Sequence, residues 1–218
     1  MTTSFRTRAA LGLAVVVGGA LLSGCGKTSE DTVSYTVDEQ IASLKVKSAG
    51  GGIELVSGSG SGIKVTEKLR YNNDKPKTRH STQGGVLTLT APDSCGGGGG
   101  IGGSTCEVSY RVEVPKALEA SLMSDGGDIT VSGGATGRLA VRSDGGGVTV
   151  GGFSAAPDLM DVNSSGGNVT LRVPDGTYAV DASTDGGGQK VDVKTDPASH
   201  HKIKARTDGG RISVITAG

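Results

Sequence analysis

The stretch RSDGGGVTV at residues 142–150 has the composition of a phosphate-binding loop, because an acid and three glycines precede a short apolar run. A phosphate loop needs a helix after its glycines, so that the helix N-terminus faces the anion. Here VTV follows, and similar corners precede ITV, VTL and ISV elsewhere in the chain. Such alternating β-branched runs indicate strands. A corner that recurs before strands predicts a structural turn rather than a nucleotide site.

Four of these corners carry an aspartate directly before the glycines. If the corners stack, the carboxylates would form a row along one edge, where they could share cations. Calcium takes six to eight oxygen ligands, so such a row with nearby carbonyls could hold it weakly. Ser165 interrupts the row, and calcium-binding β-rolls use a different glycine-aspartate motif. We therefore favour separate turn-forming residues, and expect no cofactor and no dedicated metal site. The aspartates are Asp125, Asp144, Asp185 and Asp208.

Catalytic patterns are weak. The only histidines are His80, His200 and His201, and no G-x-S-x-G elbow accompanies them. A lyase or hydrolase built on a β-helix would need acids and bases on one face, and the best candidates are Asp161, Arg172, Asp192 and Lys194. Outward charges on strands also serve solubility, and the tyrosines form no repeating stripe for glycan binding. The sequence predicts a protein that is not an enzyme.

The N-terminus has the features of a bacterial lipoprotein signal. Arg6 and Arg8 precede an apolar run, and residues 22–25 read Leu-Ser-Gly-Cys, which resembles a lipobox. We expect residues 1–24 to be removed and Cys25 to carry a diacylglycerol with two acyl chains such as palmitate. Two acyl chains hold a protein at a membrane well, since each buried methylene contributes about 0.8 kcal/mol. The expected location is the extracytoplasmic face of the cell membrane. An ordinary secreted protein is the alternative.

Two cysteines remain, Cys95 and Cys106, and they flank the run GGGGGIGGST. In an oxidising compartment a disulfide between them would close a flexible loop. Two free thiols are the alternative, and a metal site would need more ligands than these. Without the signal the chain has 20 basic and 22 acidic residues, a net charge of −2, which does not favour a nucleic-acid partner.

The chain is a repeat. Glycine contributes 39 residues and Trp none, and paired glycines begin at positions 126, 145, 166, 186 and 209, 19 to 23 residues apart. Each pair lies between two segments in which apolar residues alternate, which indicates strands. An antiparallel meander with Asp-Gly turns fits this unit, but the likeness of the units favours a parallel β-solenoid of about 20-residue coils. Stacking then places equivalent side chains over one another.

The pattern also predicts details of each coil. Leu139, Val141, Val148 and Val150 should point to one face. We expect the corner glycines to take positive φ, with the acid ahead of them bonding its own backbone. Residues 25–35 are expected as a short tether and 36–218 as one domain. The regular repeats cover 118–218, and less regular coils lie at 43–58, 79–92 and 106–122.

The stretch YRVEVPKALEASLMSDGGDITVSGGATGRLAVRSDGGGVTV, residues 110–150, resembles the bacterial putative-adhesin β-strand-repeat family, whose function is unknown. A Val-Pro step that ends a strand is followed there by serial S-x-G-x-[I/V]-x-V units, and the resemblance covers roughly residues 40–218. It implies the fold and an envelope location. It implies no catalytic residues.

These observations favour a non-enzymatic, lipid-anchored envelope scaffold or adhesin-like module with a protein or glycan partner. A polysaccharide-binding or polysaccharide-processing β-helix and an accessory sensor of envelope stress are the alternatives. The final run, RISVITAG, has no polar cap, so we expect an uncovered C-terminal edge that allows self-association. Its apolar residues are Ile212, Val214 and Ile215.

Overall fold

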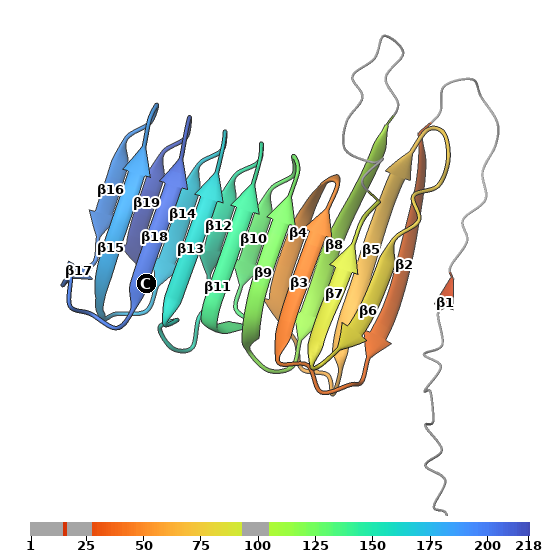
Figure 1. Cartoon of the computed structure of the whole chain (residues 1–218), viewed down its shortest axis with the longest axis horizontal. Helices are drawn as coiled ribbons and strands as arrows, with labels where there is room; N and C mark the ends of the chain where they lie inside the picture. Colours follow the sequence, from red (N-terminus) through yellow and green to blue (C-terminus); the bar gives the residue numbers. More distant parts are fainter. Residues whose placement is uncertain (1–14, 17–27, 93–104) are drawn as a thin grey trace, which may run out of the picture.

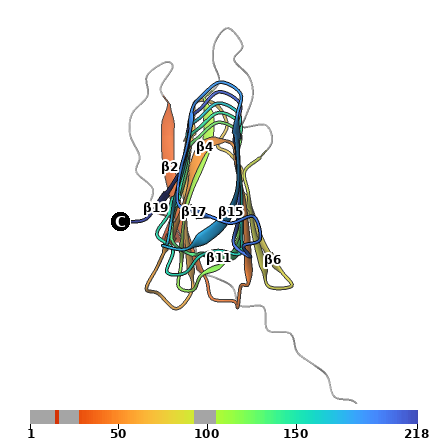
Figure 2. The same ribbon diagram turned by 90° about the vertical axis from the view of Figure 1, so that its left-hand side faces the viewer.

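The computed structural model describes residues 15–16, 28–92 and 105–218, and this part of the chain is all-β. Two large, mostly parallel sheets of ten and nine strands lie face to face around one apolar core (Figure 1). Viewed from the end, the two sheets form a flattened tube with nested corners (Figure 2). None of the described residues belongs to a helix long and apolar enough to cross a membrane.

The strands follow one another in each sheet in an order that differs from the chain order. The ten-stranded sheet contains β1 (Val15–Val16), β2 (Ser29–Val37), β5 (Ile63–Tyr71), β8 (Cys106–Val114), β4 (Gly50–Ser57), β10 (Ile129–Ser132), β12 (Val148–Gly151), β14 (Val169–Val173), β19 (Ile212–Thr216) and β16 (Gln189–Asp192). The nine-stranded sheet contains β17 (Lys194–Thr195), β15 (Thr177–Thr184), β18 (Lys202–Thr207), β13 (Leu159–Ser164), β11 (Ala135–Ser143), β9 (Leu118–Ser124), β3 (Ser43–Ser48), β7 (Val86–Thr90) and β6 (Arg79–Gln83).

Each repeat forms one layer, which consists of a strand in the nine-stranded sheet, a corner, and a strand in the ten-stranded sheet. Equivalent strands of neighbouring layers pair in parallel, so that Leu139 lies beside Met160 and Val148 beside Val169. This confirms the prediction of parallel pairing for the repeats and excludes the antiparallel meander there. Parallel pairing in register places similar side chains next to each other in both sheets.

The alternating apolar residues face inward as predicted. Leu139, Val141, Val148 and Val150 are at most 3% exposed, and the equivalent residues of the next layer are fully buried. Burying a side chain of this size stabilises the fold by roughly 1.5–3 kcal/mol. The space between the sheets is filled by Val, Ile, Leu and Ala, with Tyr110 and Tyr178 as the largest fully buried side chains.

The order of the last two layers differs from the predicted order. Strands β18 and β19 lie between the layer of β13 and β14 and the layer of β15 and β16. The prediction of an uncovered C-terminal edge is therefore wrong, because Val214 in β19 pairs with Leu171 on one side and Val191 on the other and is fully buried.

The apolar content of the last two layers explains why the final layer in the chain is not the final layer in the stack. The inward residues of the inserted layer are Ile203, Ala205, Thr207, Ile212 and Val214, all buried. The outermost layer instead has the polar Gln189 in line with Ile212. The more apolar layer takes the position that is covered on both sides.

The N-terminal part contains antiparallel pairs. Residues 43–58 form a layer from β3 and β4, but residues 79–92, predicted as a coil, form the antiparallel hairpin β6–β7. Its turn residues Gly84 and Gly85 have φ of 57° and 74°, the geometry of a tight hairpin turn. Strand β2 pairs with β5 and starts at Ser29, so part of the predicted tether at 25–35 is built into the sheet.

Because β19 lies inside the stack and not at its edge, substitutions at two adjacent residues of β19 should differ in their effect on stability. Val214→Lys places an ammonium group in the core and should lower the free energy of unfolding by about 3 kcal/mol or more. Ile215→Lys is the control, because Ile215 is only partly buried, and it should change this energy by less than about 1 kcal/mol. Urea unfolding followed by circular dichroism measures both. Equally small losses would mean that β19 is an edge strand.

Candidate functional site

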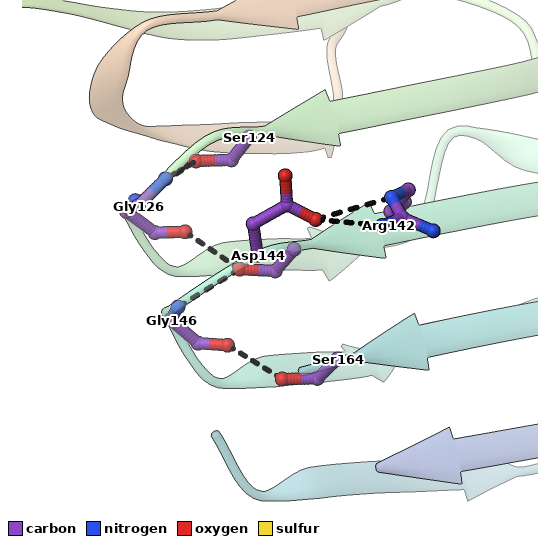
Figure 3. Close-up of polar contacts among 8 residues, drawn as sticks. Ser124, Gly126, Arg142, Asp144, Gly146 and Ser164 are labelled. Carbon is purple, nitrogen blue, oxygen red and sulfur yellow. Dashed lines mark hydrogen bonds and ion pairs between the residues drawn. The ribbon is translucent and has the colours of Figure 1, made fainter. Parts of the chain in front are cut away.

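The corner aspartates lie at the surface of the stack. Asp144, Asp185 and Asp208 are exposed and Asp125 is partly exposed. Asp144 pairs with Arg142 of its own strand at 3.0 Å (Figure 3). Among the described residues, no three His, Cys, Asp or Glu side chains are grouped so that they could hold a metal ion. The aspartates are surface residues of the turns.

The residue before each aspartate or serine is the one that joins the layers. The Ser143 hydroxyl accepts a hydrogen bond from Gly146 N–H at 2.9 Å and donates one to the Gly127 carbonyl of the neighbouring layer at 3.2 Å (Figure 3). Four other hydroxyls make the same two bonds, with distances of 2.8–3.1 Å: Ser124, Ser164, Thr207 and Thr184. We call these five residues the hydroxyl ladder.

The hydroxyl ladder crosses six layers. At one end the Gly51 carbonyl accepts hydrogen bonds from both Ser48 and Ser124, at 2.7 and 3.0 Å. At the other end Thr184 donates to the Gly210 carbonyl at 2.8 Å. The prediction that the acid ahead of the glycines bonds the backbone of the corner is wrong, because the preceding Ser or Thr accepts that bond. The available signal was that Ser or Thr occupies this position in all five regular repeats, whereas the next position is Asp in four of them and Ser in one.

The second glycine of each corner is required by close approach between layers. A Cβ on Gly146 would collide with the backbone of Gly127, and the same holds for Gly127, Gly167, Gly210 and Gly187 against the layer below each of them. The prediction that corner glycines take positive φ is wrong, because none of the five corner pairs is among the positive-φ glycines of the described residues. The first glycine has room: a Cβ on Gly145 would lie 3.5 Å from Gly126 Cα, an ordinary contact.

The outermost layer, formed by β15 and β16, is the least covered part of the core. Its inward residues Val180 and Ala182 are only partly buried and Val191 is 40% exposed, whereas the paired residue Val214 in β19 is fully buried. We call this layer the open end. It borders a cavity of about 710 Å³, which apolar side chains such as Tyr178 and Ile203 line together with charged residues. The charged lining residues are Asp181, Lys202 and Lys204.

The strand edges at the open end are also largely unpaired. Strand β17 covers β15 only at Thr177 and Tyr178. Strand β16 pairs with β19 on one side, and no described strand pairs with its other side. Unpaired N–H and C=O groups along such an edge can accept another strand. The open end thus combines exposed apolar surface with free backbone hydrogen-bonding groups.

The opposite end of the stack is closed by a polar cluster. The Glu67 carboxylate is 2% exposed and accepts hydrogen bonds from the Tyr35 hydroxyl at 2.8 Å and the Thr78 hydroxyl at 2.5 Å. The Tyr35 ring stacks on His80 with ring centres 4.5 Å apart. Burial, reinforced by the Glu67 charge, raises the pKa of Tyr35 and of the neighbouring Tyr110. Both hydroxyls therefore remain protonated at neutral pH, and that of Tyr35 donates to Glu67. We assign the cluster a structural role.

The predicted acid–base residues do not come together. Asp161 lies in β13 of the nine-stranded sheet and Arg172 in β14 of the ten-stranded sheet, and both side chains are exposed, so they point away from the core on opposite sides of the molecule. Asp192 pairs with Lys190 at 3.3 Å, and Lys194 pairs with Asp175 at 3.5 Å.

The remaining predicted histidines and cysteines give no catalytic arrangement. His201 Nδ1 lies 3.0 Å from the Pro157 carbonyl oxygen, and His200 is exposed. Cys106 opens β8. Cys25 and Cys95 lie outside the described residues, so the lipid anchor and the disulfide stay predictions.

Comparison with solved structures supports the fold. A putative cell adhesion protein from Clostridium sporogenes superposes with a TM-score of 0.61 at 14% identity, covering 88% of this chain and all of that one. A putative adhesin from Bacteroides fragilis matches at 13% identity over 87% of this chain and 97% of its own, with a TM-score of 0.35. Neither the family models nor the curated protein sequences give a match. At this identity the first likeness establishes a shared fold.

Close approach at the corners predicts different outcomes for two adjacent glycines. Gly146→Ala should lower the free energy of unfolding by about 2–3 kcal/mol, since the layers must move apart. Gly145→Ala should change it by less than about 1 kcal/mol, because its Cβ has room and its φ is ordinary. Urea unfolding distinguishes the two. A larger loss from Gly145→Ala would contradict this explanation of the corner.

The hydroxyl ladder predicts that Ser143 matters more than Asp144. Ser143→Ala leaves the partly buried Gly146 N–H and Gly127 carbonyl without their partner, which should cost about 1–3 kcal/mol. Asp144→Ala removes one exposed ion pair and should cost less than about 1 kcal/mol. The measurement is again chemical unfolding, with and without added calcium. A large, calcium-dependent loss from Asp144→Ala would point to a bound ion.

Proposed function

We propose that this chain is a non-enzymatic, lipid-anchored protein of the bacterial cell envelope, and that its stacked layers form a β-solenoid that acts as an adhesin-like interaction module. The observation that supports this most is the open end. There the core is left uncovered between β15 and β16, Val191 is 40% exposed, and one strand edge is unpaired. Exposed apolar surface next to free backbone groups is suited to binding another protein.

The position of the open end suits a tethered protein. Cys25, the proposed acylation site, is four residues before the start of β2 at Ser29. Strand β2 lies at the far end of the stack from β16 (Figure 1). An anchor on Cys25 would hold the β2 end at the membrane face and leave the open end able to reach a partner. The proposed Cys95–Cys106 disulfide would link Cys95 to the first residue of β8.

An interaction role agrees with the fold that this chain shares with the cell adhesion protein from Clostridium sporogenes. It also agrees with the outer surface, where Asp161 and Arg172 lie on different sheets and Asp192 and Lys194 are engaged in separate ion pairs. We therefore place the function at the end of the stack, rather than on a catalytic face of it.

The test is adhesion of cells that express the full chain. In a single-membrane bacterium, expression should increase adhesion of the cells to one another or to cells that lack the chain, and Val191→Lys should abolish the increase. Met123→Lys is the matched control, because Met123 is similarly exposed, at 39%, but lies in β9 away from the open end. Cys25→Ala should release the protein from the membrane fraction and also abolish adhesion.

Two results would contradict the proposal. Adhesion that survives Val191→Lys at normal surface levels would show that the open end is not the binding surface. Full membrane retention of the Cys25→Ala protein, at the size of the processed wild type, would exclude the lipid anchor.

A further inference from the structure

Strand β16 forms the free edge of the open end, and its hydrogen bonds to β19 determine which of its backbone groups are unpaired. The Gly188 carbonyl accepts a hydrogen bond from Ile212 N–H at 3.0 Å, so the backbone groups of Gly188 and, by alternation, of Lys190 face β19. The N–H and C=O of Val191 then face away from β19, toward the unpaired edge. An added strand would find its central hydrogen-bonding position at Val191.

The sequence of β16 is complementary to itself. In an antiparallel pair with a second copy, centred on Val191, each Lys190 lies opposite the Asp192 of the other copy. Opposite charges placed across strands stabilise a pair, whereas like charges destabilise it. The Lys190 and Asp192 side chains are 65% and 69% exposed, and within one copy they form an exposed ion pair at 3.3 Å, which can exchange for two ion pairs across the edge. The two exposed Val191 side chains lie opposite each other and cover one another.

We propose that the open end binds a second copy of this chain, by antiparallel pairing of β16 with β16 about a two-fold axis through Val191. The proposal names the partner for the interaction surface given under Proposed function and rests on that assignment. A second copy is favoured over an unrelated strand because one strand supplies both the central apolar residue and the two matching charges.

The symmetry limits the assembly to a dimer. A two-fold interface uses the same surface on both copies and closes on itself. The opposite end of each stack carries the antiparallel strands β2 and β6 and the Glu67 cluster, so it does not repeat the open edge. Two chains anchored through Cys25 in facing membranes could meet at their open ends.

Charge exchange tests the pairing directly. The protein is the mature chain, residues 25–218, with Cys25→Ser to prevent lipidation, and the measurement is sedimentation velocity over a range of concentrations. The wild type should form a dimer of twice the monomer mass. Lys190→Asp alone and Asp192→Lys alone should each remain monomeric, because each places like charges opposite one another twice. An equimolar mixture of the two variants should recover the dimer, since the opposed charges then match.

The controls keep failure of folding separate from failure of pairing. Both positions are exposed, so each variant should retain the circular dichroism spectrum and the urea midpoint of the wild type. The double variant Lys190→Asp, Asp192→Lys preserves the complementarity and should dimerise, as should Met123→Lys. A monomeric wild type, single variants that dimerise normally, or a mixture that stays monomeric would each overturn the proposal.

The adhesion assay separates this inference from the proposed function. If expressing cells adhere equally well to cells that lack the chain, and Val191→Lys abolishes this, the interaction surface stands but its partner is not a second copy. If adhesion requires the chain on both cells, and mixing the two charge variants restores it, the second copy is the partner.

Discussion

The stack depends on one contact, the hydrogen bond from a buried hydroxyl to a glycine carbonyl in the next layer. The side chain of Ser143 is short, so its two bonds hold Gly146 and Gly127 at the spacing of adjacent strands, about 4.8 Å. At that separation there is no space for a Cβ on Gly146. The hydroxyl and the second glycine are therefore required together. Because each hydroxyl both accepts and donates, the bonds in this buried chain also polarise one another.

The same contact explains why the ends of the stack differ. Each ladder hydroxyl donates toward the layer nearer the N-terminal strands, so Thr184 completes its bonds within the stack. Beyond it no described layer covers Val180, Ala182 or Val191. At the other end Glu67, Tyr35 and the antiparallel strands close the core with polar and aromatic groups. One end is finished by side chains, and the other retains the surface on which we base an interaction role.

Local pattern was sufficient to predict much of the fold. The alternation around Leu139 and Val148 predicted strands and their inward residues, and the likeness of the repeats predicted parallel pairing. The strands after the glycines excluded a phosphate loop. The reason why each corner needs its second glycine could not be predicted from the local sequence. Close approach depends on a neighbour some 20 residues away in the chain, whereas positive φ is a local property. For Gly84 and Gly85, where the turn is local, positive φ does occur.

The order of the layers and the site were harder to predict for the same reason. The patterns of Val180-x-Ala182-x-Thr184 and Ile203-x-Ala205-x-Thr207 are nearly equivalent, so alternation alone does not decide which layer is terminal. The distinguishing signal was Gln189 and the shorter apolar pattern after it. Once that layer is recognised as terminal, the candidate surface moves from the C-terminal strand to β16.

Amide hydrogen exchange of the mature chain with Lys190→Asp, which should be monomeric so that no second copy covers β16, tests the order of the layers most directly. If β18 and β19 are covered on both sides, the amides of Val214 and Ile212 should exchange at least about tenfold more slowly than those of β16, although β19 is closer to the C-terminus. Exchange of β19 at the rate of β16, or faster, would contradict the account, because it would place the C-terminal strand at the edge of the stack.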